Sequence, residues 1–286
     1  MIDKIVFSCS EYFAPFWNLQ AKIWKTRFNI DPVCLYFSDS KEGMSEEYGE
    51  VILCPFDDYL EEDAGAKTTD ILQITLSKFF HPSTDEDKVW LIGDIDMLPL
   101  QTAYFEQGFD RPKHGDYYHF NFTGIMQSAG DPNGPNVFMQ KGSKTMGGYD
   151  LPGHYHLATG KTFKELFFKN KTFKNVLEEI VTSEKYSLAQ VFSSEDIHKK
   201  HWCAEECYTS EKIAEGIQSG KISFGYKAYD NRRQRIDRVS FNRENKTYTG
   251  VDEKLLKSGM YVDIHCHRPY HDQEDSLLQI LNTVDV

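Results

Sequence analysis

No stretch of about 18 apolar residues occurs in the sequence, so we expect no helix that spans a membrane. Positive charge is also scarce, because 32 Lys and Arg stand against 44 Asp and Glu and give a formal net charge of −12. A nucleic-acid binder usually carries a basic surface that shifts this balance, so we expect no nucleic-acid partner. An acidic chain can still bind a nucleotide when a divalent cation supplies the missing positive charge.

Cysteine is sparse, with six residues in 286. Three of them, Cys9, Cys34 and Cys54, fall in apolar runs where the thiol acts as a small buried hydrophobe. This predicts reduced thiols rather than a disulfide framework. The first residues also lack the charged-then-apolar layout of a secretory signal. These absences predict a cytoplasmic protein.

Several familiar motifs are missing as well. The sequence has no Gly-X-Gly-X-X-Gly after a strand and no Gly-X-Ser-X-Gly nucleophile elbow. Gly160-Lys161-Thr162 resembles part of a phosphate loop, but Tyr155 stands where that loop requires glycine. The dinucleotide-binding, serine-hydrolase and phosphate-loop classes are therefore not supported.

The first hundred residues alternate strand-like and helix-like segments. Apolar runs predict strands at 4–9, 32–37, 51–55 and 88–92, and helical spacing predicts helices at 16–28 and 69–80, the second capped by Thr69 or Asp70. This β-α-β-β-α-β order predicts an α/β fold with a mostly parallel sheet flanked by helices. Ligands bind such sheets at the carboxyl ends of the strands.

The second half is less regular. Its patterns predict strands at 117–122, 136–140, 221–229 and 260–267, and helices at 163–168, 173–181, 210–219 and 275–281, with Ser210 as the cap of the third helix. No internal repeat or linker separates the two halves, so we expect a single domain.

Asp94 and Asp96 follow the fourth predicted strand in the segment Lys88-Val-Trp-Leu-Ile-Gly-Asp-Ile-Asp-Met-Leu-Pro-Leu. On an extended segment these two carboxylates would point the same way. Charges at the exit of an apolar strand are costly without partners, and a metal with a diphosphate would account for them. Two solvated loop acids are the competing interpretation.

This segment resembles the Asp-X-Asp signature of GT-A-fold glycosyltransferases, and the preceding order of elements is similar to that fold. The resemblance implies that Asp96 ligates Mn²⁺ or Mg²⁺ and that Asp94 contacts the donor ribose, or the metal through water. It also implies a nucleotide-sugar donor, UDP-linked before GDP-linked, and a glycan or other hydroxyl acceptor. Residues 1–100 would then bind the donor and residues 101–286 the acceptor.

A second candidate segment is Tyr261-Val-Asp-Ile-His-Cys-His-Arg-Pro. As a strand it would place Asp263, His265 and His267 on one face. Neutral imidazole is a good manganese or zinc ligand, and the family resemblance implies that a C-terminal histidine completes the metal shell. His265 is preferred over His267, although the pattern does not decide between them, and a structural histidine pair is the alternative. Arg268 would contact the diphosphate.

The segment departs from the His-X-X-Gly-X-X-Lys-Pro-Trp motif of one retaining family within this fold. This departure argues against that particular family. An inverting transferase needs a carboxylate that takes the proton of the acceptor hydroxyl. Glu205 and Glu206 follow a tryptophan in the second half, as such acids do in many inverting relatives, and Glu206 is the preferred base. Solvated helix acids are the alternative, and the sequence does not fix the stereochemistry.

Other candidates come from position alone. By the same resemblance, Ser8, Ser10 and Tyr12 lie where the family holds the nucleoside. Lys67, Asp70 and Gln73, on the helix before the fourth strand, could also reach the nucleotide. Plain loop and helix surface residues are the alternative for all six. Aromatic and histidine side chains form a candidate platform for a sugar acceptor, or else part of the core: Tyr117, Tyr118, His119, His154, Tyr155 and His156.

Two rival functions remain. A zinc hydrolase would use His265 and His267, although the His-X-His pair of barrel hydrolases lies on an early strand rather than near the C-terminus. A non-catalytic nucleotide-sugar or carbohydrate binder would bind the donor without turnover. Metal-dependent sugar transfer is the function that the sequence favours.

Overall fold

The computed structural model describes residues 2–56, 66–122, 151, 153–183, 186, 204–228 and 234–284. As predicted, the fold is α/β, with a large, mostly parallel sheet flanked by helices. The strands of this sheet are β1 (Lys4–Ser10), β2 (Asp31–Phe37), β3 (Glu50–Leu53), β4 (Val89–Ile92), β6 (Asp116–Phe122), β7 (His156–Thr159) and β8 (Ser223–Ala228), in the order β3-β2-β1-β4-β7-β6-β8.

The contacts divide the chain into two compact units. Unit 1 comprises Met1–Cys54, Gly93–Asp110 and Tyr229–Val286, and unit 2 comprises Pro55–Ile92 and Arg111–Ala228. Both units draw segments from either side of residue 100. This division by contacts does not follow the predicted boundary between donor and acceptor halves, whose roles stay a prediction.

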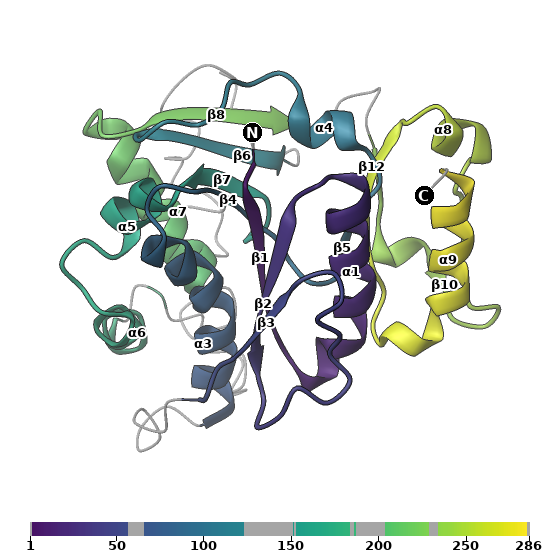
Figure 1. Cartoon of the computed structure of the whole chain (residues 1–286), viewed down its shortest axis with the longest axis horizontal. Coiled ribbons are helices and arrows are strands. Elements are labelled where there is room, and N and C mark those ends of the chain that lie inside the picture. Colours follow the sequence, from purple (N-terminus) through teal and green to yellow (C-terminus); the bar gives the residue numbers. More distant parts are fainter. Residues whose placement is uncertain are drawn as a thin grey trace. The chain divides into compact units, whose positions relative to one another are not determined.

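In unit 1, β1 pairs in parallel with β2, and β2 in parallel with β3. Helix α1 (Ala14–Arg27) follows the 3-10 turn η1 (Glu11–Phe13) and lies along these strands (Figure 1). Its buried face includes Trp17 and Trp24, and Phe7 of β1 meets the Trp17 ring edge-on at 6.4 Å. The predicted strands and helix are confirmed, and the helix begins two residues earlier than predicted.

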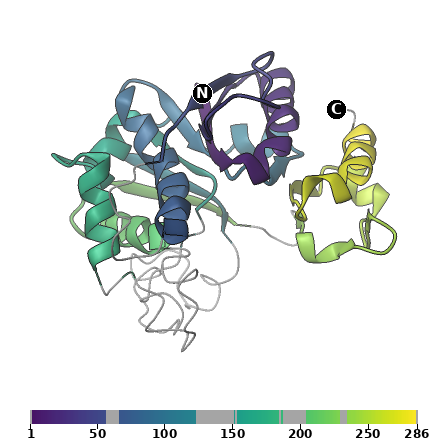
Figure 2. The ribbon, with the colours of Figure 1, turned by 90° about the horizontal axis from the view of Figure 1, so that it is seen from below.

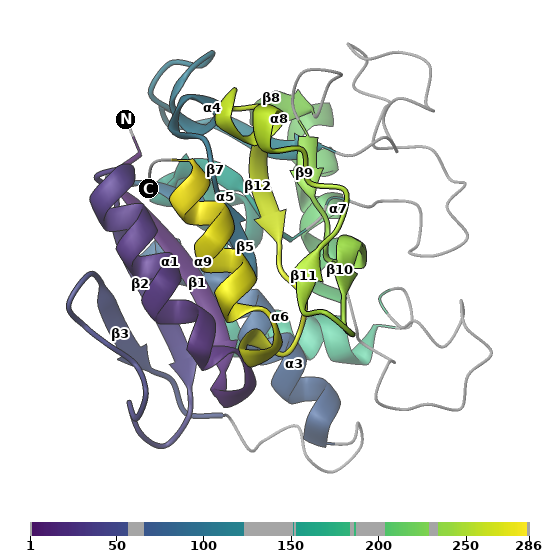
Figure 3. The same ribbon diagram turned by 90° about the vertical axis from the view of Figure 1, so that its right-hand side faces the viewer.

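Unit 1 also contains a smaller sheet, in which β12 (Tyr261–His265) lies between β5 (Met97–Pro99) and β9 (Gln234–Ile236) (Figure 3). The remaining elements are the hairpin β10 (Phe241–Asn242) and β11 (Thr247–Tyr248), the helices α4 (Thr102–Glu106), α8 (Glu253–Lys257) and α9 (Glu274–Thr283), and the 3-10 turns η9 (Arg238–Ser240) and η10 (Tyr270–Asp272). Because β5 pairs antiparallel with β12, the segment before β5 lies beside the end of β12.

In unit 2, β7 pairs antiparallel with both β4 and β6, and β8 pairs in parallel with β6. Its helices are α3 (Ala66–Phe80), α5 (Gly160–Phe167), α6 (Phe173–Thr182) and α7 (Ala204–Gln218), with the 3-10 turn η3 (His81–Thr84), and they pack against one another (Figure 2). Strand β7 was not predicted, because four buried residues are too short a run to show a period.

Two predicted helix caps are wrong, because both helices begin earlier. Helix α3 begins at Ala66, ahead of Thr69 and Asp70, and α7 begins at Ala204. The Ser210 hydroxyl instead lies inside α7 and accepts a hydrogen bond from the Leu151 N–H at 2.8 Å. The predicted strand at 136–140 lies outside the described residues. No helix in the described ranges has the length and apolar character needed to cross a membrane.

Candidate functional site in unit 1

The two aspartates lie at a turn rather than on an extended segment. Strand β4 ends at Ile92, and the Met97 N–H donates to the Asp94 carbonyl at 3.0 Å. A Cβ on Gly93 would lie 2.4 Å from Cε1 of the buried Phe7, so only glycine allows this close approach. The prediction of an extended segment is therefore wrong, because the chain turns between the two aspartates.

Gln20 of α1 holds this turn in place. Its side chain is fully buried, and its Nε2 donates to the carbonyls of Ile95 at 3.0 Å and Met97 at 2.7 Å. The Gln20 Oε1 accepts from the Trp24 indole N–H at 3.0 Å. Sequence reasoning missed this residue. The available signal was an amide on the apolar face of a helix, where a buried polar group needs partners.

Asp96 is 3% exposed, and its carboxylate is bound by Arg268. The guanidinium donates to Asp96 Oδ2 from Nε at 2.7 Å and from Nη2 at 2.5 Å. The Arg268 Cζ also lies 4.8 Å from the centre of the Phe13 ring. A guanidinium with five N–H groups keeps donors for a further anion while it holds this carboxylate.

His265 lies at the end of β12, beside the same carboxylate. Its Nε2 is 3.8 Å from Asp96 Oδ2, and its Nδ1 is 3.6 Å from Asp237 Oδ2. Burial lowers the pKa of His265 most, and Asp96 opposes that effect by raising it. The lowered pKa favours the neutral imidazole, which is the form that binds a metal.

His267 does not share this face, because β12 ends at His265 and the strand alternation does not reach it. Its ring stacks on Phe241 at 4.7 Å with an interplanar angle of 18°. Its backbone N–H donates to the Tyr248 hydroxyl at 2.9 Å and to Gln273 Oε1 at 3.0 Å. Burial, and then Arg243, lower the pKa of the His267 imidazole.

Asp263, the third member of the predicted face, is fully buried. Its carboxylate accepts hydrogen bonds from Arg235, its partner residue on β9, from Nε at 3.1 Å and from Nη2 at 3.2 Å. The predicted single face of Asp263, His265 and His267 is therefore wrong. Of these three side chains, His265 is the one that lies beside Asp96.

Asp96 and His265 fit the predicted cation. The 3.8 Å between Asp96 Oδ2 and His265 Nε2 suits two ligands of one ion, since bonds of about 2.0–2.3 Å place neighbouring ligand atoms roughly 3–4 Å apart. Within the described residues, no group of three or more His, Cys, Asp or Glu side chains is arranged to hold a metal. Asp94 is half-buried at the start of the turn, and its predicted role stays a prediction.

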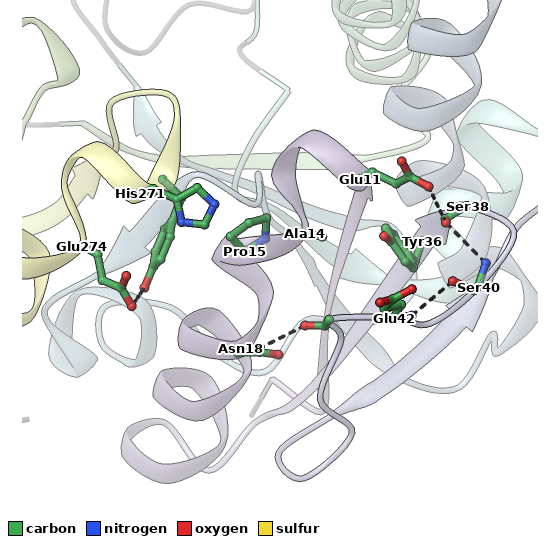
Figure 4. A pocket seen from close by; sticks show the side chains of 12 residues that line it. Glu11, Ala14, Pro15, Asn18, Tyr36, Ser38, Ser40, Glu42, His271 and Glu274 are labelled. Carbon is green, nitrogen blue, oxygen red and sulfur yellow. Dashed lines mark hydrogen bonds between the residues drawn. The ribbon is translucent and has the colours of Figure 1, made fainter.

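A cavity of about 580 Å³ lies where β2 ends and α1 begins (Figure 4). Glu11 accepts a hydrogen bond from the Ser38 hydroxyl at 3.0 Å, and the Ser40 N–H donates to Ser38 Oγ at 3.4 Å. Its other lining residues are Ala14, Pro15, Asn18, Tyr36, Glu42, Gly43, Tyr270, His271 and Glu274. Carboxylate and hydroxyl oxygens therefore dominate its polar surface.

The three residues predicted to hold the nucleoside lie close to this cavity in sequence. Ser8 is half-buried in β1, Ser10 directly precedes η1, and Tyr12 is 56% exposed with its ring 5.0 Å from Phe13. None of the three lines the cavity of Figure 4, which is reached by Glu11 instead. Their predicted contacts with a nucleotide stay a prediction.

Unit 1 contains a second cavity, with a volume of about 410 Å³. Its lining residues are Arg238, Val239, Phe241, Arg243, His267 and Arg268. Sequence reasoning did not identify Arg238 or Arg243. Neither stands in a motif, and only the fold of the β10–β11 hairpin brings them together with residues 267 and 268.

The remaining candidates belong to unit 2. Gln73 is 1% exposed in α3, and Lys67 lies in the first turn of that helix, with its side chain outside the described residues. Glu205 and Glu206 lie in the first turn of α7. Glu205 is buried, and Glu206 Oε1 accepts from the Gly153 N–H at 2.9 Å. Their predicted catalytic roles stay predictions.

Five of the six residues predicted as an aromatic and histidine platform belong to the core of unit 2, and the sixth, Tyr118, is half-buried. Tyr117, His119, Tyr155 and His156 are fully buried, and His154 is 8% exposed. The Tyr117 hydroxyl is 2.8 Å from His156 Nδ1. Rings without exposed faces do not offer a surface to a sugar, so the core interpretation holds for these residues.

No protein-family model and no curated protein sequence matches this chain. Among solved structures, the galactosyltransferase LgtC in complex with donor and acceptor sugar analogues is 11% identical, with 99% of this chain and 96% of that chain covered and a TM-score of 0.47. The bifunctional glycosyltransferase WbbM is 10% identical, with 100% and 52% covered and a TM-score of 0.45. The glycosyltransferase GlyE from Streptococcus pneumoniae TIGR4 is 11% identical, with 79% and 45% covered and a TM-score of 0.39. At identities and TM-scores this low, these likenesses assign neither an activity nor a site residue to this chain.

Proposed function

We propose that the protein is a metal-dependent glycosyltransferase, transferring a hexosyl or pentosyl group from a nucleotide-diphosphate sugar to a hydroxyl acceptor such as a glycan. A UDP-sugar is the preferred donor. The observation that carries the proposal is the convergence of Asp96, His265 and Arg268. The carboxylate and the imidazole supply ligands for a cation. The guanidinium beside them supplies hydrogen-bond donors for an anion.

Asp96 and His265 would hold Mn²⁺ or Mg²⁺, with Asp94 beside them at the start of the turn. Such ions are often held by one or two carboxylates together with the phosphates of a substrate, which suits a site with so few protein ligands. The bound ion would neutralise charge on the departing nucleoside diphosphate. Arg268 would donate hydrogen bonds to phosphate oxygens in a geometry that a guanidinium fits well.

The cavity of Figure 4 is the proposed location of the donor's nucleoside. Glu11 and Ser38 present oxygen atoms that accept hydrogen bonds from ribose hydroxyls, and the volume of about 580 Å³ lies in the range of small-molecule sites. The cavity and Arg268 are connected through Tyr270, which follows Arg268 by two residues and lines the cavity.

Glu206 is the proposed base that removes the proton of the acceptor hydroxyl in an inverting reaction, with Glu205 as the second choice. Its Oε1 accepts a hydrogen bond from the Gly153 N–H at 2.9 Å, which helps to fix the position of the carboxylate. We expect Glu206→Gln to lose transfer and to keep donor binding. Full transfer activity in this variant would place the base elsewhere.

A zinc hydrolase built on His265 and His267 is less well supported, because the two rings have different surroundings. His265 lies beside Asp96 and Asp237, whereas His267 stacks on Phe241. Metal analysis of the purified protein separates these functions, since tightly held zinc favours the hydrolase and exchangeable manganese favours the transferase. A non-catalytic binder would bind the donor and release no product.

The test is release of nucleoside diphosphate from a panel of UDP- and GDP-sugars with Mn²⁺, followed by chromatography. In the absence of an acceptor we expect slow hydrolysis of the donor sugar. We expect Asp96→Asn to abolish this hydrolysis while the circular dichroism spectrum stays unchanged. Asp275→Asn, at an exposed position in α9, is the matched control and should hydrolyse at the parental rate. Parental hydrolysis by Asp96→Asn would refute the metal assignment.

A further inference from the structure

The second cavity of unit 1 has an unusual charge for this chain. The full sequence carries a net charge of −12, yet the charged residues that line the cavity are Arg238, Arg243 and Arg268. No carboxylate is among its lining residues. A local concentration of guanidinium groups on an acidic protein repels like charge and attracts anions.

Local structure fixes the backbone at Arg238 and Arg243. Asp237 caps η9 by accepting from the Val239 N–H at 3.1 Å. The Asn242 side chain accepts from the Glu244 N–H at 2.9 Å and thereby closes the turn that carries Arg243. The backbone on both sides of Phe241 is therefore shaped by its own hydrogen bonds.

The wall of the cavity is also fixed. Phe241 stacks on His267, and the His267 backbone is hydrogen-bonded to both Tyr248 and Gln273. Gln273 Nε2 in turn donates to the His267 carbonyl. The stacked pair is thus tied to β11 and to the residue before α9, which makes the cavity a preformed feature of the fold.

Two of the three guanidinium groups form no ion pair with a described residue. Over the described ranges, neither Arg238 nor Arg243 has a carboxylate oxygen within 4.0 Å, whereas Arg268 is bound to Asp96. Arg238 is half-buried and Arg243 is exposed, so the like charges repel one another only moderately, and an anionic ligand would reduce that repulsion. Guanidinium groups pair with phosphate oxygens through short, charge-assisted hydrogen bonds.

We propose that the cavity lined by Arg238, Arg243, His267 and Arg268 is a binding site for a phosphate group. Its volume of about 410 Å³ admits a phosphate that is part of a larger molecule. The phosphate belongs either to the diphosphate of a nucleotide or to a phosphorylated acceptor. Assigning it to one of these sources rests on the proposed function, whereas anion binding by the cavity does not.

The test is isothermal titration calorimetry of the full chain with pyrophosphate, UDP, inorganic phosphate and glycerol phosphate, in buffer that contains EDTA. We expect Arg238→Gln and Arg243→Gln each to weaken the binding of phosphate-bearing ligands about tenfold. Lys246→Gln is the matched control, because it removes one positive charge from the same hairpin outside the cavity. We expect its affinities to stay within about twofold of the parent.

The ligands distinguish the two sources. If the arginine variants bind UDP and pyrophosphate more weakly than the parent does, the site is supported and its phosphate belongs to a nucleotide. If they bind only glycerol phosphate and inorganic phosphate more weakly, the site is supported and its phosphate belongs to an acceptor. Parental affinity for all four ligands in the Arg238→Gln, Arg243→Gln double variant overturns the proposal. Equal weakening by Lys246→Gln also overturns it, because the effect would then be non-specific.

This experiment is independent of sugar transfer. If no sugar donor is cleaved but the arginine variants lose anion binding, the proposed function fails and the phosphate site stands. If donors are cleaved in an Asp96-dependent manner but the arginine variants bind anions normally, the transferase stands and the phosphate site fails.

Discussion

The guanidinium of Arg268 donates two hydrogen bonds to a single oxygen of Asp96, from Nε at 2.7 Å and from Nη2 at 2.5 Å. Asp96 is the carboxylate that would hold the cation, and Arg268 also lines the phosphate cavity. The same side chain therefore connects the two proposed sites. An ion that binds Asp96 Oδ2 competes with Arg268, whereas an anion in the cavity offers Arg268 another partner.

Replacing Arg268 should change the affinities for metal and nucleotide in opposite directions. In Arg268→Gln, Mn²⁺ should bind about tenfold more tightly in the absence of nucleotide, because a competing positive charge is gone. UDP should bind about tenfold more weakly, because a phosphate donor is lost. Electron paramagnetic resonance of free Mn²⁺ and calorimetry with UDP measure the two affinities. A decrease in both would show that Arg268 does not compete with the ion.

Gln20 should be as important to the site as to the fold. Gln20→Leu keeps the side chain's size but leaves the carbonyls of Ile95 and Met97 without their amide donor, so we expect a loss of at least about 2 kcal/mol in unfolding free energy. We also expect weaker binding of Mn²⁺ and UDP, because the turn that carries Asp96 loses its support. Urea unfolding and calorimetry measure these effects.

The control for this variant is Ile23→Ala on the same helix. Ile23 is 1% exposed, and its truncation destabilises the core without touching the turn. We expect this variant to lose a similar amount of stability and to keep parental ligand affinities below its melting temperature. Equal loss of affinity in both variants would reduce the role of Gln20 to core packing.

The sequence was sufficient for the elements whose pattern is local. Strands β1 and β12 are short apolar runs and helix α1 has apolar residues at helical spacing, so their places in the fold were predicted to within about two residues. The prediction that the Asp94–Asp96 segment is functional rests on its position after a buried strand and stays a prediction. Its geometry did not follow, because the turn depends on the close approach of Gly93 to Phe7, which are distant in the sequence.

The same limit explains the arginines. Arg268 pairs with Asp96, 172 residues away in the chain, and no local pattern encodes that contact. Arg238 and Arg243 converge only because η9 and the short β10–β11 hairpin fold back beside His267. Contacts of this kind depend on tertiary packing, so a single sequence could suggest Arg268 as a phosphate ligand and could not identify its partners.

Gly93 should not tolerate even one additional carbon atom. A Cβ at this position would lie 2.4 Å from Cε1 and 3.0 Å from Cδ1 of Phe7, so Gly93→Ala should destabilise the protein by about 1–3 kcal/mol. Adding Phe7→Leu removes those ring atoms. The double variant should therefore lose less stability than the two single losses combined, as measured by thermal unfolding. Strict additivity would place the strain elsewhere.

The buried pair of Asp263 and Arg235 should matter far more than the exposed ion pairs. Asp263 is fully buried and accepts from Arg235 Nε at 3.1 Å and from Nη2 at 3.2 Å. Asp263→Asn should therefore cost about 3 kcal/mol in urea unfolding, because it leaves a guanidinium that is only 12% exposed without this carboxylate. The exposed pair of Glu253 and Lys257, at 2.5 Å, is the comparison, and Glu253→Gln should leave stability unchanged because solvent screens that pair.

Replacing both partners at once, as Asp263→Leu with Arg235→Met, should recover most of the loss, since no unpaired charge then remains there. A double variant as unstable as Asp263→Asn would mean that the pair sets the register of β12 against β9 and does more than compensate charge.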